Sequence, residues 1–407
     1  MDNKIKFGFW NYLPVGTLDK DIVHKWVDIN CNLFMSFRFI ENESKKEDMI
    51  ALLDEAHKVG VKVIINDERT EYLRLNKMSK EEFVKGVKEA VNDFGNHPAT
   101  FGFYGGDEPF SDQEDNFCFT MALLKELLPN HLHYGNLLPY WSGLLGEPKE
   151  NFREDSFYYE KINRLIKNGK LDILAFDQYT QCYNTSKDQR EGIKLFLKGM
   201  HHFMQIANAN HIPLYISLLS IGHFSYREPT EYDIRWQINV SAAMGAKAII
   251  WFYFHQYARD YGFGNPPFLG ERAYITPMYG KLQRQQYLFN ERYGKVFEEI
   301  EIDKYYFRGK DWGEPVYPNN LNEFKRFDIK DDNLLTIVSF GHYRDDPNHK
   351  VMIVVNGDQE FANVYSLYFN NGKECHFDLM QGDMKIFDLT TKKTGPVELK
   401  VDLSGQP

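Results

Sequence analysis

Eight short apolar segments alternate with helical segments over roughly the first three quarters of the chain, and this alternation limits the possible folds more than any other feature. The intervening stretches place apolar residues at helical spacing, as in KEDMIALLDEAHKVG. Strands that alternate with helices form parallel sheets, and eight such units close into a (β/α)8 TIM barrel. The strands are predicted in residues 5–13, 31–39, 61–68, 99–108, 131–139, 171–179, 212–220 and 246–254.

The pattern changes near residue 302, where helical spacing disappears. Short alternating segments such as LLTIVSF and KVMIVVNG follow, separated by turn sequences such as RDDPN and NNG. We therefore expect an α/β barrel domain over residues 1–302 and a small all-β antiparallel sandwich domain over residues 303–407.

Composition and charge argue against several classes of partner. The 407 residues include 58 acidic and 48 basic side chains, and a net charge of -10 does not suit a nucleic-acid backbone. No stretch is long and apolar enough to span a membrane, and the opening residues, MDNKIKFGFW, contain no apolar leader. As it stands the sequence predicts a cytoplasmic protein, or a secreted or periplasmic one from which a signal peptide was removed. It leaves the oligomeric state open.

Polar residues gather where the predicted strands end, which is the face of a TIM barrel that carries active sites. Carboxylates end the third strand at Asp67, the fourth at Asp107 and Glu108, and the sixth at Asp177. In the fourth strand, FGFYGGDEPF, the glycines and Pro109 allow a sharp turn that presents Glu108 at the rim.

Each of these carboxylates also has a purely structural explanation. Asp107 could cap the segment that follows it, because Asp is a good helix cap. Asp67, with Glu68 and Arg69, could form a surface ion pair, and Asp177 could be a hydrogen-bonded aspartate at a strand end.

Aromatic residues make up 15% of the chain, which fits either a large aromatic core or a cleft whose flat rings stack on sugars. The long loop 257–274 is expected to wall such a cleft. Candidate stacking residues near strand ends are Trp10, Tyr104, Trp141, Tyr179, Trp251 and Tyr253. Candidate polar substrate-binding residues are Arg38, Asp67, Asn136, His223 and His255. Neither the histidines nor the four scattered cysteines show metal-ligand spacing, so no metal or other cofactor is predicted.

The motif YGGDEP and the surrounding barrel resemble the clan A glycoside hydrolases, in the style of the family 42 β-galactosidases, over about three quarters of the chain. In that clan the fourth strand ends in Asn-Glu, often followed by Pro, and the glutamate is the general acid/base. The resemblance implies that Glu108 has this role and that Asp107, in place of the asparagine, binds a sugar hydroxyl. A second carboxylate beside Glu108 would raise its pKa by like-charge repulsion.

The seventh strand departs from the clan, which carries its nucleophilic glutamate there, because IPLYISLLSIGHF contains no carboxylate. As second carboxylate, acting as nucleophile or base, Asp177 is favoured, followed by Glu228 and then by Asp67 or Glu68. The resemblance thus implies a glycosidase that cleaves O-glycosidic bonds of an oligo- or polysaccharide. The alternative is a non-catalytic carbohydrate-binding barrel that has lost the nucleophile of strand 7.

Overall fold

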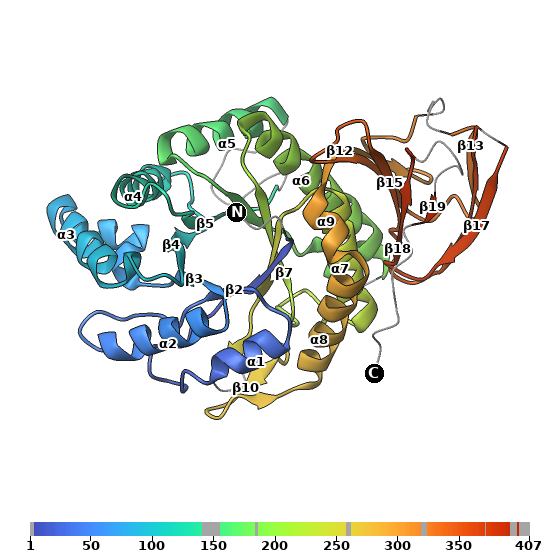
Figure 1. Cartoon of the computed structure of the whole chain (residues 1–407). Coiled ribbons are helices and arrows are strands. Elements are labelled where there is room, and N and C mark those ends of the chain that lie inside the picture. The colour runs from blue at the N-terminus through green and yellow to red at the C-terminus, as the bar shows by residue number, and fades with distance from the viewer. Residues whose placement is uncertain are drawn as a thin grey trace. The chain divides into compact units, whose positions relative to one another are not determined.

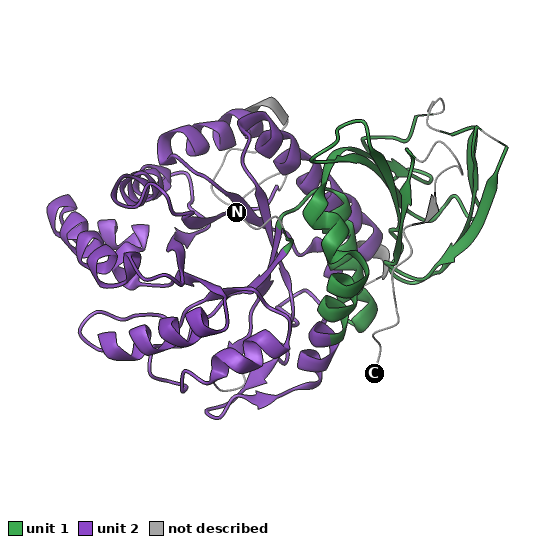
Figure 2. Cartoon of the chain, viewed as in Figure 1, with its two compact units in different colours: residues 1–5, 229–247, 284–407 green, residues 6–228, 248–283 purple. Residues whose placement is uncertain are grey.

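A computed structural model of the protein describes residues 4–140, 155–183, 186–257, 262–318, 324–370, 372–390 and 397–398. The chain forms two compact units (Figure 2). The barrel unit comprises residues 6–228 and 248–283, and the sandwich unit comprises residues 1–5, 229–247 and 284–407.

Eight parallel strands close into a barrel in chain order, with β1 paired to β8, which confirms the predicted (β/α)8 topology (Figure 1). All eight predicted segments contain a strand, and each strand is shorter than its segment at both ends. The strands are β1 (Lys6–Phe9), β2 (Leu33–Met35), β3 (Lys62–Ile65), β4 (Thr100–Asp107), β5 (Tyr134–Leu137), β6 (Leu174–Asp177), β7 (Leu214–Leu219) and β8 (Ala248–Phe252).

Helices follow the strands around the outside of the barrel (Figure 1). The sequence sets their starts locally: Ser79 and Glu82 form a reciprocal capping box at the start of α3. The helices of the barrel unit are α1 (Ile22–Asp28), α2 (Lys46–Lys58), α3 (Lys80–Ala90), α4 (Glu114–Leu127), α5 (Asp155–Gly169) and α6 (Ser186–Asn210), together with the first residues of α8 (Pro277–Phe289).

Large aromatic side chains fill the barrel interior. The indole N–H of Trp10 donates to Ser217 Oγ at 3.0 Å, and the hydroxyl of Tyr134 lies 3.1 Å from the same oxygen. These bonds satisfy polar atoms that the packing of rings would otherwise bury without partners. Trp10 also packs edge-on against Tyr104 and Tyr134, so the floor of the barrel mouth is rigid and aromatic.

The sandwich unit confirms the predicted antiparallel β-region. One sheet has the order β12-β14-β15-β18-β19 and the other β13-β16-β17. Between them Tyr365 stacks on Phe327 and Phe377 in a shared core. The strands are β12 (Ile300–Arg308), β13 (Arg326–Ile329), β14 (Thr336–Tyr343), β15 (Lys350–Asn356), β16 (Asn363–Tyr368), β17 (Glu374–Leu379), β18 (Met384–Asp388) and β19 (Val397–Glu398).

The sequence did not predict β12, β13 and β17, because charged residues interrupt their apolar alternation, as in EIDKYYFR. The predicted domain boundary near residue 302 falls inside β12. The division into domains at 1–302 and 303–407 stays a prediction.

Helix α7 (Glu231–Ala243) precedes β8 in sequence but belongs to the sandwich unit. The Trp236 indole N–H donates to the Gly357 carbonyl at 2.7 Å, and the Asn239 amide donates to the Gly382 carbonyl at 2.9 Å. Gly382 has φ +65°, and a Cβ there would lie 2.6 Å from Trp236 Cα. The sheet therefore meets α7 backbone to backbone at this glycine.

We expect Gly382→Ala to lower the free energy of unfolding by about 2 to 4 kcal/mol, the sum of left-handed strain and overpacking against α7. Gly372→Ala is the matched control, since Gly372 has φ +85° and open space where the Cβ would lie. Gly372→Ala should lower the free energy of unfolding only by the left-handed strain, about 1 to 2 kcal/mol. Urea unfolding of both variants measures the difference, and equal losses would contradict the close approach.

Candidate active site

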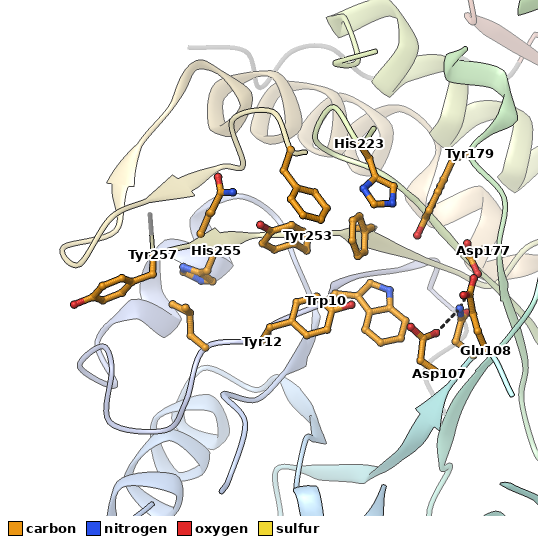
Figure 3. Close-up of a pocket in the computed structure, with 15 residues that line it drawn as sticks. Trp10, Tyr12, Asp107, Glu108, Asp177, Tyr179, His223, Tyr253, His255 and Tyr257 are labelled. Carbon is orange, nitrogen blue, oxygen red and sulfur yellow. Dashed lines mark hydrogen bonds between the residues drawn. The ribbon is translucent and has the colours of Figure 1, made fainter. Parts of the chain in front are cut away.

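The end of β4 places two consecutive carboxylates on the same side of the chain. Gly105 and Gly106 are required by close neighbours, because a Cβ would lie 2.4 Å from Met121 Sδ at the first and 2.2 Å from the Tyr72 ring at the second. Glu108 then adopts φ +42°. This left-handed residue interrupts the alternation of a regular strand, so Asp107 and Glu108 both line one pocket (Figure 3).

An asparagine connects these carboxylates to a third. Asn136, at the end of β5, donates from Nδ2 to Asp107 Oδ1 at 3.0 Å and to Asp177 Oδ1 at 2.8 Å. The carboxyl groups of Glu108 and Asp177 are hydrogen-bonded to each other. The C-terminal ends of three adjacent strands, β4, β5 and β6, thus build one hydrogen-bonded cluster, which we call the carboxyl cluster (Asp107, Glu108, Asn136 and Asp177).

Burial raises the pKa of every carboxyl in this cluster. Burial, and then the charge of Glu108, raise the pKa of Asp107 to about 7. Burial also raises the pKa of Glu108, whereas the hydrogen bond from Asp177 lowers it. The pKa of Asp177 lies well above its usual range because of burial and the charges of Glu108 and Asp107. Burial and mutual repulsion therefore favour a proton on the Glu108–Asp177 pair over two ionised carboxylates side by side.

Aromatic rings form the remaining walls of a pocket of about 520 Å³. His223 stacks on Phe263 with ring centroids 4.9 Å apart, and Tyr12 meets Tyr253 edge-on at 5.6 Å. No lysine or arginine occurs among the described lining residues. These are Trp10, Tyr12, Leu13, Asp107, Glu108, Asn136, Asp177, Tyr179, His223, Phe252, Tyr253, His255, Gln256, Tyr257 and Phe263.

Three buried polar atoms of lining residues have no hydrogen-bond partner within the part of the chain that the structure describes. They are Asn136 Oδ1, His223 Nδ1 and Gln256 Nε2. An unpaired buried donor or acceptor costs roughly 1 to 3 kcal/mol, so such atoms are expected where a polar ligand or ordered water completes the site. The pocket thus combines apolar walls with polar atoms ready to bind hydroxyl or amide groups.

Nine of the predicted site residues line this pocket: Trp10, Asp107, Glu108, Asn136, Asp177, Tyr179, His223, Tyr253 and His255. His255 is less available than expected, because the Trp26 indole N–H donates to its Nε2 at 2.9 Å and its ring stacks on Phe268. Burial lowers the pKa of His255 to about 3, so the ring is neutral.

Three predicted site residues lie elsewhere. Asp67 forms an ion pair with Arg69, with Nη2 and Oδ2 2.7 Å apart. The sequence interpretation considered such a pair at the surface, whereas both side chains are buried. Arg38 pairs with Glu71 at 2.9 Å, and Trp251 is fully buried in β8. The structure therefore does not bring Asp67, Arg38 or Trp251 to the pocket.

Two of the predicted stacking residues also differ from expectation. Tyr104 belongs to the buried core of the barrel and is not among the pocket's lining residues, and Trp141 lies outside the described residues. Part of the loop predicted to wall the cleft does so, through Tyr257 and Phe263. The sequence interpretation missed Tyr12, Phe252 and Gln256; Tyr12 follows Trp10 at strand spacing, which is a signal that could have identified it.

The other candidates for a second carboxylate do not line the pocket. Glu228 lies 3.3 Å from Lys281 Nζ, and Glu68 accepts the backbone N–H of Glu41. The end of β7 contributes Ser220, whose hydroxyl bonds to backbone carbonyls after β8. Asp177 remains the predicted candidate that reaches Glu108.

A group of possible metal ligands, Asp21, His24 and Glu55, lies on α2 and at the start of α1, where Glu55 is paired with Lys58. It is separate from the residues that line the pocket. Within the described ranges, no helix combines the length and the apolar character that crossing a membrane requires.

The raised pKa of Asp177 gives a stability prediction. A raised folded-state pKa stabilises the fold at acid pH, and this stabilisation is lost as the pH rises through the folded-state pKa. Asp177→Asn supplies a donor to Glu108 that does not titrate. We therefore expect it to raise the free energy of unfolding by about 1 to 2 kcal/mol at pH 8 to 9 and to change little at pH 4 to 5.

Asp67→Asn is the control, because it breaks a buried ion pair and should destabilise the protein at both pH values, by about 3 to 5 kcal/mol. Urea unfolding at the two pH values measures both variants. A loss of stability in Asp177→Asn at high pH would show that the Asp177 carboxylate is ionised and well paired.

Comparisons with known proteins identify relatives in fold. No protein-family model matches the sequence, and no curated protein is similar to it. Among solved structures, a catalytic mutant of a GH42 β-galactosidase from G. stearothermophilus matches with a TM-score of 0.60 at 10% identity, covering 94% of this chain and 98% of that one.

Two further β-galactosidases match the barrel. The enzyme from Rahnella sp. R3 has a TM-score of 0.54 at 12% identity over 74% of this chain and 58% of its own. The enzyme from the psychrophilic Marinomonas ef1 has a TM-score of 0.53 at 11% identity, over 72% and 60%. This chain thus spans about three fifths of the length of these two enzymes, and its fold resembles that of clan A glycoside hydrolases.

Proposed function

We propose that the protein is a glycoside hydrolase whose general acid/base is Glu108. The observation that carries the proposal is the Glu108–Asp177 carboxyl pair, whose two members interact directly in an aromatic-walled pocket at the C-terminal end of the barrel strands. Active sites of TIM barrels lie at this end. Glycosidases need a carboxyl that keeps its proton near neutral pH.

Substrate binding follows from the pocket walls. The rings of Trp10, Tyr179 and Tyr253 offer flat surfaces to the C–H faces of a sugar, while Asn136 Oδ1 and Gln256 Nε2 offer an acceptor and a donor to its hydroxyls. The volume of about 520 Å³ suits a small number of sugar units. The fold neighbours named β-galactosidases support a carbohydrate as substrate.

The roles within the pair follow from burial. Both residues line the pocket, where Glu108 is partly exposed and Asp177 is buried. Glu108 therefore delivers the proton of the pair to the glycosidic oxygen as the C–O bond breaks. Both carboxyls are then ionised, and the Asn136 amide still donates to Asp177. In the second step the Glu108 carboxylate accepts a proton from the attacking water.

Asp177 therefore receives a different role from the nucleophile or base predicted from sequence. Attack on the sugar needs the two carboxyl groups about 5 to 5.5 Å apart, and activation of water about 6.5 to 9.5 Å. A direct hydrogen bond between Glu108 and Asp177 leaves no room for a sugar or water between them. We propose that Asp177 is a positioning residue whose interaction with Glu108 keeps a proton on the pair.

We expect Glu108→Gln to reduce kcat on aryl glycosides with poor leaving groups by about 10²-fold or more, because the amide cannot protonate the leaving oxygen. The loss should be smaller for a dinitrophenyl leaving group, which departs without a proton. Hydrolysis of a panel of aryl glycosides and oligosaccharides measures both. Glu89→Gln, at an exposed position of α3, is the control and should retain activity.

Two outcomes would contradict this assignment. Full activity in Glu108→Gln would place the acid elsewhere. Binding of sugars without turnover of any substrate in the panel would favour the non-catalytic carbohydrate-binding barrel.

The pH profile tests the carboxyl cluster as a unit. Activity should fall at acid pH as Asp107, with a pKa of about 7, becomes protonated, and at alkaline pH as the Glu108–Asp177 pair loses its proton. The Asn136 amide lowers the pKa of both Asp107 and Asp177. Asn136→Ala should therefore move both limbs of kcat/KM to higher pH, and a shift of either limb to lower pH would exclude this coupling.

A further inference from the structure

Among the described residues that line the pocket, no carboxylate is placed to attack a sugar from the side opposite Glu108. Within the described lining residues the carboxylates are Asp107, Glu108 and Asp177, and Asn136 ties the two aspartates together. Asp177 is engaged with Glu108, and the sequence of β7, LYISLL, contains no carboxylate. The described lining residues therefore offer no protein nucleophile for a double displacement.

We infer that the substrate supplies it: the pocket is built for β-linked 2-acetamido-2-deoxy sugars, with Asp107 holding the acetamido group whose carbonyl oxygen attacks the anomeric carbon. Substrate-assisted hydrolysis is an established alternative to an enzymic nucleophile. This inference rests on the proposed function and names its substrate class.

The residues of the carboxyl cluster fit the two positions that this chemistry needs. The acid must reach the oxygen on C1, and a hydrogen-bond acceptor must reach the N–H on the neighbouring C2. Adjacent sugar carbons call for adjacent carboxylates on one side of the chain, and the left-handed Glu108 places Asp107 and Glu108 in that relation (Figure 3). A strand with regular alternation would point one of them away.

Asp107 is held as an acceptor for an amide N–H. Its Oδ1 accepts from Asn136, and the half-buried Asp107 has no cation beside it among the described lining residues. An N–H donor would complete its hydrogen bonding and favour its ionised form. Asn136 Oδ1, the second acceptor at this point, also has no partner in the described part of the chain. The rings of Trp10 and Tyr12, stacked 6.0 Å apart, give an apolar wall for the acetyl methyl.

The bond changes balance without any further reactant. As the acetamido oxygen bonds to C1, the glycosidic C–O bond breaks and Glu108 protonates the departing oxygen, while the amide nitrogen takes the positive charge in a cyclic oxazolinium. Water then attacks C1, Glu108 accepts its proton, and the ring opens to restore the acetamide. The anomeric configuration is retained, and the first step requires the leaving group trans to the acetamido group, hence a β-linkage in gluco- and galacto-sugars.

The test compares nitrophenyl β-N-acetylglucosaminide and β-N-acetylgalactosaminide with the β-glucoside and β-galactoside, using the full chain. We expect at least one acetamido substrate to have a kcat/KM at least about 100-fold above its 2-hydroxy counterpart. Replacing its acetyl by mono-, di- and trifluoroacetyl should lower kcat stepwise, because fluorine weakens the attacking carbonyl. Asp107→Asn should lower kcat on the acetamido substrate about 100-fold or more.

The outcomes separate this inference from the proposed function. Preference for the 2-hydroxy glycosides, with Glu108→Gln inactive on them, would overturn the inference and leave the glycosidase standing. A rate that does not depend on fluorination would also overturn it, because the acetamido group would then not be the nucleophile. Turnover of no glycoside in the set would overturn both.

Discussion

The enclosure of three carboxyl groups in one pocket is the constraint on which the site depends. Three ionised carboxylates at this depth would repel one another, so the cluster must hold protons and neutral donors instead. Asn136 provides the donor that joins Asp107 to Asp177, and Asp177 in turn interacts directly with Glu108. The need to limit repulsion between carboxylates therefore helps to determine which side chains at the ends of β4, β5 and β6 are hydrogen-bonded to one another.

The sequence predicted the barrel well because its signals are local. Each strand and helix carries its own periodicity, and the order of the elements then leaves few topologies. The strand-end rule placed Asp107, Glu108, Asn136 and Asp177 at one mouth, as the structure has them. The same rule wrongly predicted Asp67 as a site residue, because its carboxylate forms a buried ion pair with Arg69, two positions later.

What the sequence could not supply was which side chains share a hydrogen bond. Spacing along the chain does not reveal that Asn136 bridges two aspartates or that Glu108 adopts a left-handed conformation. The aromatic walls were predicted only in part, because Phe252 and Phe263 come from a strand end and a loop whose approach is decided by tertiary packing. The strands β12, β13 and β17 were not predicted because charged residues interrupt their alternation of apolar and polar side chains.

The assignment of α7 to the sandwich unit has a consequence for the order in which the protein can fold during synthesis. The Trp236 indole N–H finds its acceptor, the Gly357 carbonyl, 121 positions later in the chain. When all eight barrel strands have been synthesised, the face of α7 that carries Trp236 is still exposed, because the sandwich unit is incomplete. Gly382, whose backbone will pack against this face, has not yet been synthesised. The barrel sequence is therefore finished before the partners of its seventh helix exist, which links the maturation of the two units in time.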